Sequence, residues 1–188
     1  MSRLKAVTVA GADRRSRGLL DGVEKKLGMV PNIMRTMASS PATLEAYLAF
    51  SNAMATGSLS AKLREQVALA VGEANNCEYC LAAHAALGRR AGLNDDEVTA
   101  SRRGASADQK AAAVLTFAQK VVVERGRVGD ADVASLRAAG YGDGEIAEIV
   151  GNVALNIFTN YFNHVAQTEI DFPKVQGLTH TADCSCAA

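Results

Sequence analysis

The sequence predicts an all-α domain, and three observations carry that prediction. Only three prolines occur in 188 residues, so few positions are barred from a helix interior. The alternation of β-branched and polar residues that is typical of strands is nearly absent. Capping residues recur at the spacing at which helices begin. A chain of this length buries one substantial core, which we place in residues 1–173, followed by a polar tail, 174–188.

Composition and charge argue against several classes of function. Twenty basic residues balance twenty acidic ones, so no net field attracts nucleic acid or an anionic membrane. No uninterrupted run of about 18 apolar residues is present to span a bilayer. The first residues also lack the apolar run of a secretory signal. We therefore expect a cytoplasmic protein without nucleic-acid or membrane partners.

The first predicted helix follows Ser40, a good N-cap residue. Pro41 fits the first helical position, and Gly57 suits the end of the helix. A second helix starts after Ser60 and runs to about residue 74, with apolar residues at helical spacing on one side.

Asn75 and Asn76 predict a bend, because short amide side chains compete for backbone hydrogen bonds. A new helix begins near Cys77, runs to about Arg90 and ends at Gly92. Four further helices are predicted. Two begin at the capping-box pairs Asn94 with Glu97 and Ser106 with Gln109, one is capped by Asp130 and ends at Gly140, and one runs from Asp143 to about Gln167.

Two segments of the chain resemble each other at a shift of eighty residues. REQVALAVGEANNCEYCLAAHAA lies beside GEIAEIVGNVALNIFTNYFNHVA, which places Cys80 opposite Asn160 and His84 opposite His164. Either two amphipathic helices match by chance, or a helical hairpin is duplicated and only one copy keeps its thiols. The predicted all-α fold includes the duplicated hairpin.

The stretch CEYCLAAH, residues 77–84, carries the candidate chemistry. Side chains three and four apart share one face of a helix, so Cys77 and Cys80 are close enough to form a disulfide. A helix start near Cys77 favours thiolate, the reactive form. His84, one turn beyond Cys80, faces the same way and is placed to take a thiol proton.

Two carboxylates compete to orient this histidine. Glu73 continues the stripe of the thiols and His84 if the helix is straight. Glu65 reaches the site only if the chain folds back after residue 74. Spacing slightly favours Glu73, and the predicted bend favours Glu65.

Other interpretations of these residues are open. A buried pair of small residues is the plainest, and CxxCxxxH also supplies three zinc ligands, with a fourth available from His164 or an acid. Thioredoxin-like exchange belongs in a βαβ setting, which this sequence lacks.

We interpret His164 as a structural residue and Tyr79 as a residue that packs in the core. Cys184 and Cys186 lie on the tail, where we expect disorder, and are the alternative thiols for resolving a disulfide or binding a metal.

With the glutamate, the bend, the paired thiols and the histidine in view, the chain resembles the carboxymuconolactone decarboxylase superfamily, and within it the AhpD-like, peroxidase-related branch. LREQVALAVGEANNCEYCLAAH and AGLNDDEV carry the resemblance in a core motif at 60–104. VPNIMRTMASSPATLEAYLAF and NHVAQTEIDFP support it. The resemblance implies an AhpD-like helical fold and a homo-oligomer, either a trimer or a trimer-based hexamer.

The resemblance also implies roles for the residues. Cys80 would be the thiolate that attacks the hydroperoxide and becomes a sulfenic acid, and Cys77 would donate a proton and condense with it to the disulfide. His84 would accept the Cys80 proton, and the family's glutamate falls on Glu65. In one departure, Tyr79 stands where mycobacterial-type members carry a relay histidine, which puts the efficiency of the relay and the natural substrate in question.

The predicted function is that of a thiol-dependent peroxidase that reduces hydroperoxides, is re-reduced by a dithiol donor and needs no bound cofactor or metal. One alternative is a decarboxylase-like lyase that uses Glu65 and a histidine, although that branch generally lacks the CxxC pair. The other is a non-enzymatic helical protein that binds zinc or senses redox state.

Overall fold

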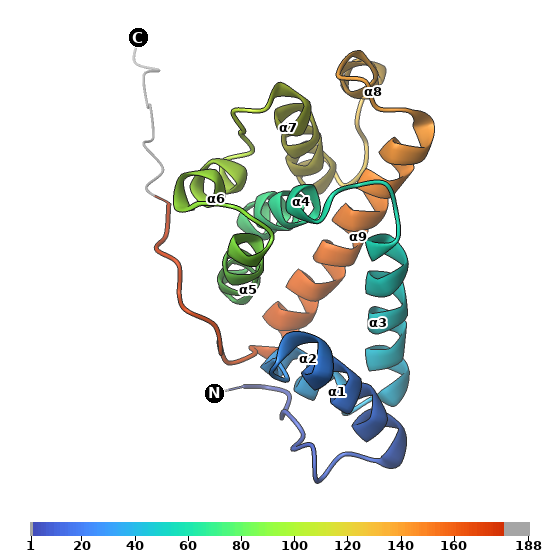
Figure 1. Cartoon of the computed structure of the whole chain (residues 1–188), viewed down its shortest axis with the longest axis vertical. Helices are drawn as coiled ribbons and strands as arrows, with labels where there is room; N and C mark the ends of the chain where they lie inside the picture. The colour runs from blue at the N-terminus through green and yellow to red at the C-terminus, as the bar shows by residue number, and fades with distance from the viewer. Residues whose placement is uncertain (1, 179–188) are drawn as a thin grey trace.

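The computed structural model describes residues 2–178 and is all-helical, as predicted (Figure 1). No strand occurs in this part of the chain. Its helices are α1 (Arg14–Leu27), α2 (Asn32–Met37), α3 (Pro41–Ala55), α4 (Ala61–Ala74), α5 (Glu78–Arg90), α6 (Asp95–Arg102), α7 (Gln109–Val123), α8 (Asp130–Ala138) and α9 (Asp143–Ala166).

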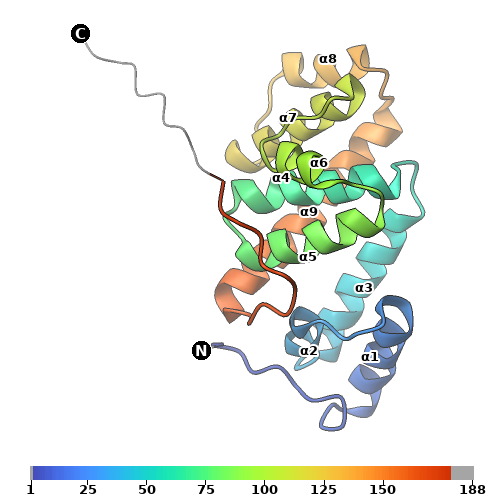
Figure 2. The same ribbon diagram turned by 60° about the vertical axis from the view of Figure 1, so that its left-hand side comes forward.

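The helix α4 is the centre of the fold, in contact with α5, α6, α7 and α9. The chain reverses after α4, so α5 runs back alongside it, and the long α9 crosses both (Figures 1 and 2). Val67, Leu69 and Val71 of α4 are fully buried. Each such side chain stabilises the fold by about 1.5–3 kcal/mol, so α4 anchors the elements that surround it.

The buried side chains form two main clusters. One lies between α4, α7 and α9 and holds aliphatic residues such as Val114 and Ile149. The other joins α1, α2 and α3 to the start of α5, and it contains Cys77, Tyr79 and Cys80. The candidate thiols are therefore part of a hydrophobic core rather than of the surface.

Several predicted helix starts are confirmed. Ser40 and Ser60 cap α3 and α4, each by accepting a hydrogen bond from the backbone N–H three residues further on. Asn94 and Glu97 form the predicted capping box at α6. These signals are local, which is why the sequence alone was enough to place them.

Two predicted boundaries differ from the structure. Asp108, not Ser106, caps α7, because its carboxylate accepts the Lys110 N–H while the Ser106 hydroxyl accepts the N–H of Asp108. Gly129 precedes α8, and Asp130 is the first helical residue. The first error amounts to two positions, because Ser106 and Asp108 both carry side chains that can cap a helix, and the second amounts to one position.

The helices α1 and α2 were not expected from the sequence, although their signals are present. Asp13 caps α1 through its carboxylate, and Gly28 ends it in the left-handed conformation, with φ of 77°. Pro31 then precedes α2. These two helices cover the thiols from one side.

The predicted duplication of a helical hairpin is not what the structure contains. The first segment is the hairpin of α4 and α5, whereas the second lies within α9, a single unbroken helix. Asn76 breaks the first segment with φ of 53°. The corresponding Asn156 stays helical and bonds the carbonyl of Asn152, one turn back in the same helix. The similarity therefore reflects two amphipathic helices.

After α9 the chain runs back across α5 and α6 (Figures 1 and 2). The carbonyl of Gln176 accepts a hydrogen bond from Arg102, 2.7 Å away, and Val175 packs on the cluster around Leu69. Among the described residues, none of the helices combines the length and the apolar character that crossing a bilayer requires.

Candidate active site

The turn between α4 and α5 brings the candidate residues together. Asn76 adopts the left-handed conformation, and the Cys77 N–H bonds the Gly72 carbonyl at 2.9 Å. Cys77 is then the N-cap of α5, and its sulfur accepts the N–H of Cys80 at 3.4 Å. Cys77 thus occupies the position that usually belongs to a serine or an aspartate, next to the positive end of the helix dipole.

The two thiols are in direct contact. The Cys77 and Cys80 sulfurs lie 2.6 Å apart, and both cysteines are free and 2% exposed. The amide of Asn163, from α9, donates a hydrogen bond to the Cys80 sulfur at 3.2 Å. A disulfide therefore needs only a small movement of the two side chains.

The pKa values of the two thiols shift in opposite directions, whereas the family resemblance made Cys80 the thiolate. The hydrogen bond from the Cys80 thiol lowers the pKa of Cys77, helped by the backbone N–H at the helix start, although burial opposes this shift. Burial raises the pKa of Cys80 well above its ordinary value, and the neighbouring Cys77 adds to the rise. The surroundings therefore favour Cys77 over Cys80 as the thiol that ionises first, in line with the helix dipole.

Glu65 and His84 form an ion pair next to the thiols. His84 Nδ1 lies 2.8 Å from Glu65 Oε2, and both side chains are 22% exposed. Burial alone favours the neutral imidazole, but the charge and hydrogen bond of Glu65 raise the pKa of His84 above its ordinary value. The only side-chain partner of this imidazole among the described residues is Glu65, so the geometry favours a charged histidine that holds a proton.

The preference of sequence spacing for Glu73 is wrong. Its carboxylate lies 2.7 Å from the Arg102 guanidinium in a buried ion pair on the other side of α4. Because α5 folds back along α4, Glu65 lies beside His84 while Glu73 points to α6. The bend at residues 75–76 therefore decides which acid meets the histidine.

Tyr79 packs between the thiols and the C-terminal segment, as predicted. Its ring meets Phe172 edge to face, with 6.0 Å between centroids. Its hydroxyl donates to Asp171 at 2.8 Å and accepts the Ile33 N–H at 3.2 Å. Burial raises the pKa of Tyr79, so the hydroxyl keeps its proton and ties α2, α5 and the C-terminal segment together.

The remaining sequence candidates stand apart from this chemistry. His164 Nε2 lies 2.9 Å from the Asn75 carbonyl, a contact that holds the end of α9 against the turn. Within residues 2–178, no group of three histidine, cysteine or acidic side chains is arranged to hold a metal ion. Cys184 and Cys186 lie outside the described residues.

The polar stripe of α9 was not predicted from the sequence. Four buried asparagines follow one another at helical spacing on a largely apolar helix, at positions 152, 156, 160 and 163. Asn160 accepts a hydrogen bond from Asn75, and Asn163 donates to Cys80. The signal was in the sequence, because regularly spaced asparagines on a buried helix face need polar partners from another element.

Two neighbouring cavities lie beside the candidate site, and the smaller one is lined by Cys80. A pocket of about 50 Å³, here called the inner pocket, is lined by Cys80, His84 and mostly apolar side chains. A larger cleft of about 570 Å³ lies between α1, α3, α4 and α9 and includes Glu65. The two share four lining residues, Leu27, Met34, Tyr47 and Leu87.

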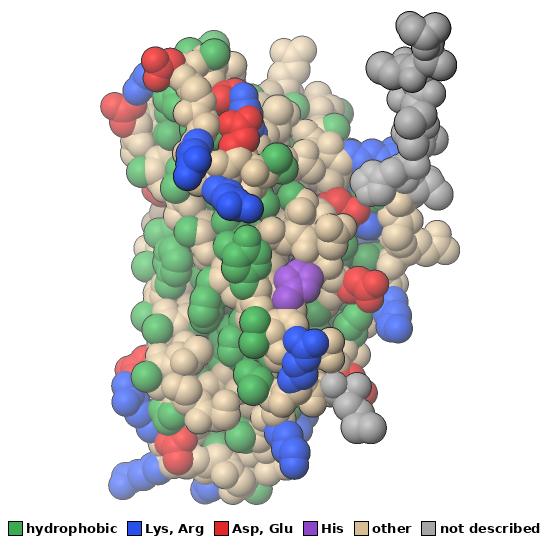
Figure 3. All heavy atoms as spheres, turned by 180° about the vertical axis from the view of Figure 1, so that it is seen from behind, with side chains coloured by type: hydrophobic (Ala, Val, Ile, Leu, Met, Phe, Trp, Pro, Cys, Tyr) green, Lys and Arg blue, Asp and Glu red, His purple; other side chains and the backbone are tan. Residues whose placement is uncertain are grey.

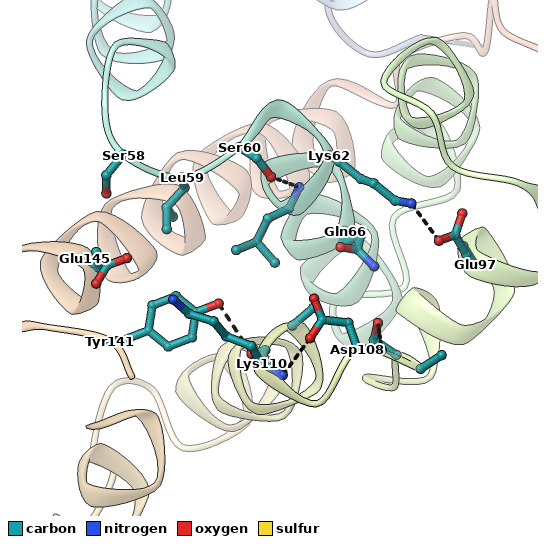
Figure 4. Close-up of a pocket in the computed structure, with 14 residues that line it drawn as sticks. Ser58, Leu59, Ser60, Lys62, Gln66, Glu97, Asp108, Lys110, Tyr141 and Glu145 are labelled. Carbon is teal, nitrogen blue, oxygen red and sulfur yellow. Dashed lines mark hydrogen bonds and ion pairs between the residues drawn. The ribbon is translucent and has the colours of Figure 1, made fainter. Parts of the chain in front are cut away.

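A separate polar pocket of about 360 Å³ lies where α4, α7 and α9 begin (Figure 4). Lys62 pairs with Glu97 at its edge, while Gln66 points into it from α4 (Figure 4). Ser60 marks this end of α4 and the thiols follow the other, about 20 Å away along the helix. None of its lining residues is a cysteine or a histidine, so thiol chemistry belongs to the other site.

Comparisons with known proteins agree with this arrangement. The chain matches the carboxymuconolactone decarboxylase family over residues 41–124. It is 28% identical to a solved alkylhydroperoxidase AhpD core, an uncharacterized peroxidase-related protein from Ralstonia eutropha JMP134, with a TM-score of 0.81 over 90% of this chain and 92% of that one. The family match and this neighbour support the assignment of the chain to the AhpD/carboxymuconolactone decarboxylase superfamily.

Other solved structures share this fold. An uncharacterized peroxidase-related protein from Silicibacter sp. TM1040 is 27% identical, with a TM-score of 0.78 over 90% of this chain and 94% of that one. The debrominase Bmp8, in complex with 2,3,4-tribromopyrrole, is 22% identical, with a TM-score of 0.75 over 91% of this chain and 94% of that one. A comparison with curated proteins gave no match.

Proposed function

We propose that this protein is a thiol-dependent peroxidase that reduces organic hydroperoxides and is re-reduced by a dithiol. The observation that carries the proposal is the contact of two free thiols, 2.6 Å apart, beside the Glu65–His84 pair. The family match and the peroxidase-related neighbours support it at a coarser level. A dithiol cycle of this kind fits a reducing compartment, the cytoplasm.

The proposed reaction starts with Cys80, because it lines the inner pocket and Cys77 does not. The Cys77 thiolate takes the Cys80 proton across their contact, and the Cys80 sulfur attacks the terminal oxygen of the hydroperoxide. The O–O bond breaks, Cys80 becomes a sulfenic acid, and the alkoxide takes the proton from Cys77 to leave as an alcohol. In this scheme Cys77 serves as the base that the sequence analysis assigned to His84.

The second step closes the disulfide. The Cys77 thiolate attacks the Cys80 sulfenic sulfur, the S–O bond breaks, and hydroxide takes a proton from the His84 imidazolium to leave as water. Glu65 raises the pKa of His84 and so keeps this proton available near neutral pH. The sum is one hydroperoxide reduced to alcohol and water, and one dithiol oxidised to a disulfide.

The shape of the cavities favours an apolar substrate. The inner pocket of about 50 Å³ has room for a hydroperoxy group, and the adjoining cleft of about 570 Å³ has room for an organic body. Burial of apolar surface contributes about 25 cal/mol per Å². We therefore expect kcat/KM for cumene hydroperoxide to exceed that for hydrogen peroxide.

The direct test is turnover with cumene hydroperoxide and dithiothreitol. Cys80→Ser is expected to lower the rate to that of the uncatalysed reaction, because no sulfenic acid can form at this position. The matched control is the double variant Cys184→Ser/Cys186→Ser, which removes two thiols that the proposed reaction does not use and is expected to keep the activity. Unchanged turnover in Cys80→Ser would remove the mechanism.

Three alternatives, a lyase, a zinc protein and a redox sensor, make different predictions. A lyase that uses Glu65 without redox cycling keeps its activity after alkylation of the thiols. A zinc protein retains stoichiometric metal when it is purified without a chelator. A redox sensor forms the disulfide but shows no catalytic turnover with excess dithiol.

We also propose that the protein assembles as a homo-oligomer, a trimer or a trimer-based hexamer. Large hydrophobic side chains are exposed along α9, and the rear view shows hydrophobic side chains gathered between charged ends (Figure 3). The exposed members on α9 are Val150, Phe158, Tyr161 and Val165. A contiguous apolar surface of this kind is typical of an interface between subunits.

A further inference from the structure

The larger of the two cavities beside the thiols carries positive charge that the proposed reaction does not use. This cavity of about 570 Å³, here called the outer cleft, lies between α1, α3, α4 and α9 and shares part of its lining with the inner pocket. Its charged lining residues are Lys26, Arg64 and Glu65. Glu65 is already paired with His84, 2.8 Å away. Two cations therefore line a cleft whose one acidic residue has a partner.

Both cations are held at the outer cleft by neutral oxygens rather than by acids. Lys26 Nζ, in the last turn of α1, donates a hydrogen bond to Asn52 Oδ1 at 3.1 Å, and Asn52 lines the same cleft. Arg64 donates through Nη1 to the Leu59 carbonyl. Within residues 2–178, neither Lys26 nor Arg64 forms a salt bridge. Their positions are fixed while their charges lack an acidic partner, which favours an anionic ligand.

The rest of the outer cleft suits an aliphatic chain. Leu19, Leu48 and Leu155 are among its apolar lining residues. The wall from α1 also contains Gly18 and Gly22, one turn apart, and a Cβ added at either would meet no atom within 4 Å. Glycine destabilises a helix interior relative to alanine, so α1 gives up stability at two positions where a side chain would narrow the cleft.

We propose that the outer cleft binds an amphiphilic organic anion, an aliphatic carboxylate whose chain lies against α1 and whose carboxylate bonds Arg64, with Lys26 adding positive charge. The inference rests on the proposed peroxidase and names its substrate class, an aliphatic hydroperoxide that also carries a carboxylate. Arginine suits this role because its planar guanidinium presents parallel N–H donors to a carboxylate. The bond to Leu59 occupies only Nη1, which leaves Nε and Nη2 for the ligand.

The same arrangement sets the spacing of the two functional groups of the ligand. Arg64 directly precedes Glu65 in α4, and Glu65 is paired with His84. His84 lies four residues from Cys80 in α5, about 6 Å along the helix. The carboxylate and the hydroperoxy group are therefore separated by several carbon atoms, as in a medium-chain fatty acid oxidised away from its head group.

The first test measures binding and needs no turnover. Isothermal titration calorimetry of the full chain compares octanoate with 1-octanol, which has the same chain length and no charge. Octanoate is expected to bind about tenfold more tightly and to lose this advantage in Arg64→Gln. Arg103→Gln removes an exposed charge outside the cleft and is the matched control that keeps it. Equal affinities for the two ligands, or a preference that survives in Arg64→Gln, overturns the proposal.

The second test places the anion next to Cys80. Octanoate is expected to inhibit the turnover of cumene hydroperoxide competitively, with KM raised and kcat unchanged. Gly22→Leu narrows the outer cleft, so we expect it to lower kcat/KM for cumene hydroperoxide about tenfold and that for hydrogen peroxide by less than about twofold. Gly144→Leu, in α9, is the matched control, because its Cβ is equally unobstructed and lies outside the cleft. Non-competitive inhibition contradicts the proposal, as does octanoate binding that Gly22→Leu leaves unchanged.

The two tests also separate this inference from the peroxidase proposal. A protein that binds octanoate through Arg64 but turns over no hydroperoxide retains the anion site and loses the proposed function. A protein that reduces cumene hydroperoxide but binds octanoate and 1-octanol equally retains the function and loses the anion site.

Discussion

The two sulfurs of the site differ in acidity although they are only three residues apart. Cys77 has the backbone N–H of Cys80 and the start of α5 beside it, whereas burial and the neighbouring Cys77 raise the pKa of Cys80. Position within the helix therefore favours ionisation of Cys77, and cavity access favours Cys80 as the thiol that meets the hydroperoxide. The same pair can serve as base and nucleophile without a separate histidine base.

His84 and Glu65 give a prediction for pH. The pKa of His84 is raised in the folded protein, so its contribution to stability is complete below about pH 6.5 and is lost as pH rises through the raised value. The difference in free energy of unfolding between wild type and Glu65→Gln is therefore expected to shrink as pH rises above 6.5. Urea unfolding at a series of pH values measures it, and a constant difference would contradict the assignment.

Tyr79 gives a prediction that separates stability from chemistry. Tyr79→Phe removes a hydroxyl that bonds Asp171 and the Ile33 N–H, and it leaves both without this partner. We expect a loss of about 1–3 kcal/mol in the free energy of unfolding, with the rate of disulfide formation little changed. A large fall in that rate at unchanged stability would instead place Tyr79 in the proton transfer.

At the scale of elements, the turn between α4 and α5 is the feature on which the site depends. Asn76 has φ of 53°, a conformation that costs most residues with a side chain about 1–2 kcal/mol. Asn76→Ala is expected to lower the free energy of unfolding by about 1 kcal/mol, whereas Asn76→Gly is expected to be nearly neutral. Thermal and urea unfolding of the two variants provide the comparison, and equal losses would rule out backbone strain as the cause.

The sequence predicted this turn correctly, and with it the caps of α3, α4 and α6, because such signals lie within a few residues of one another. It did not predict that Asn163 would donate to Cys80, since 83 residues separate the two. Nor did it establish which thiol is charged or which acid meets His84. Those answers depend on burial and on how α5 folds back along α4, and neither is a property of spacing along the chain.

At the scale of the whole molecule, the apolar face of α9 predicts association. Tyr161 and Val165 are 56% and 63% exposed on the same helix face. Replacing both, as Tyr161→Glu with Val165→Lys, is expected to shift the protein to a smaller species in analytical ultracentrifugation. A matched pair of changes on α8, Ser135→Glu with Arg137→Glu, is expected to leave the mass unchanged. A wild-type monomer at micromolar concentration would contradict the proposal.

The central claim is that Cys77 and Cys80 together reduce a hydroperoxide. Its most direct test is mass spectrometry of the 77–84 peptide after the reduced protein has met one equivalent of cumene hydroperoxide. The account predicts a disulfide between Cys77 and Cys80, formed with one equivalent of cumyl alcohol and without a link to Cys184 or Cys186. Two free thiols in that peptide, with the hydroperoxide intact, would contradict it.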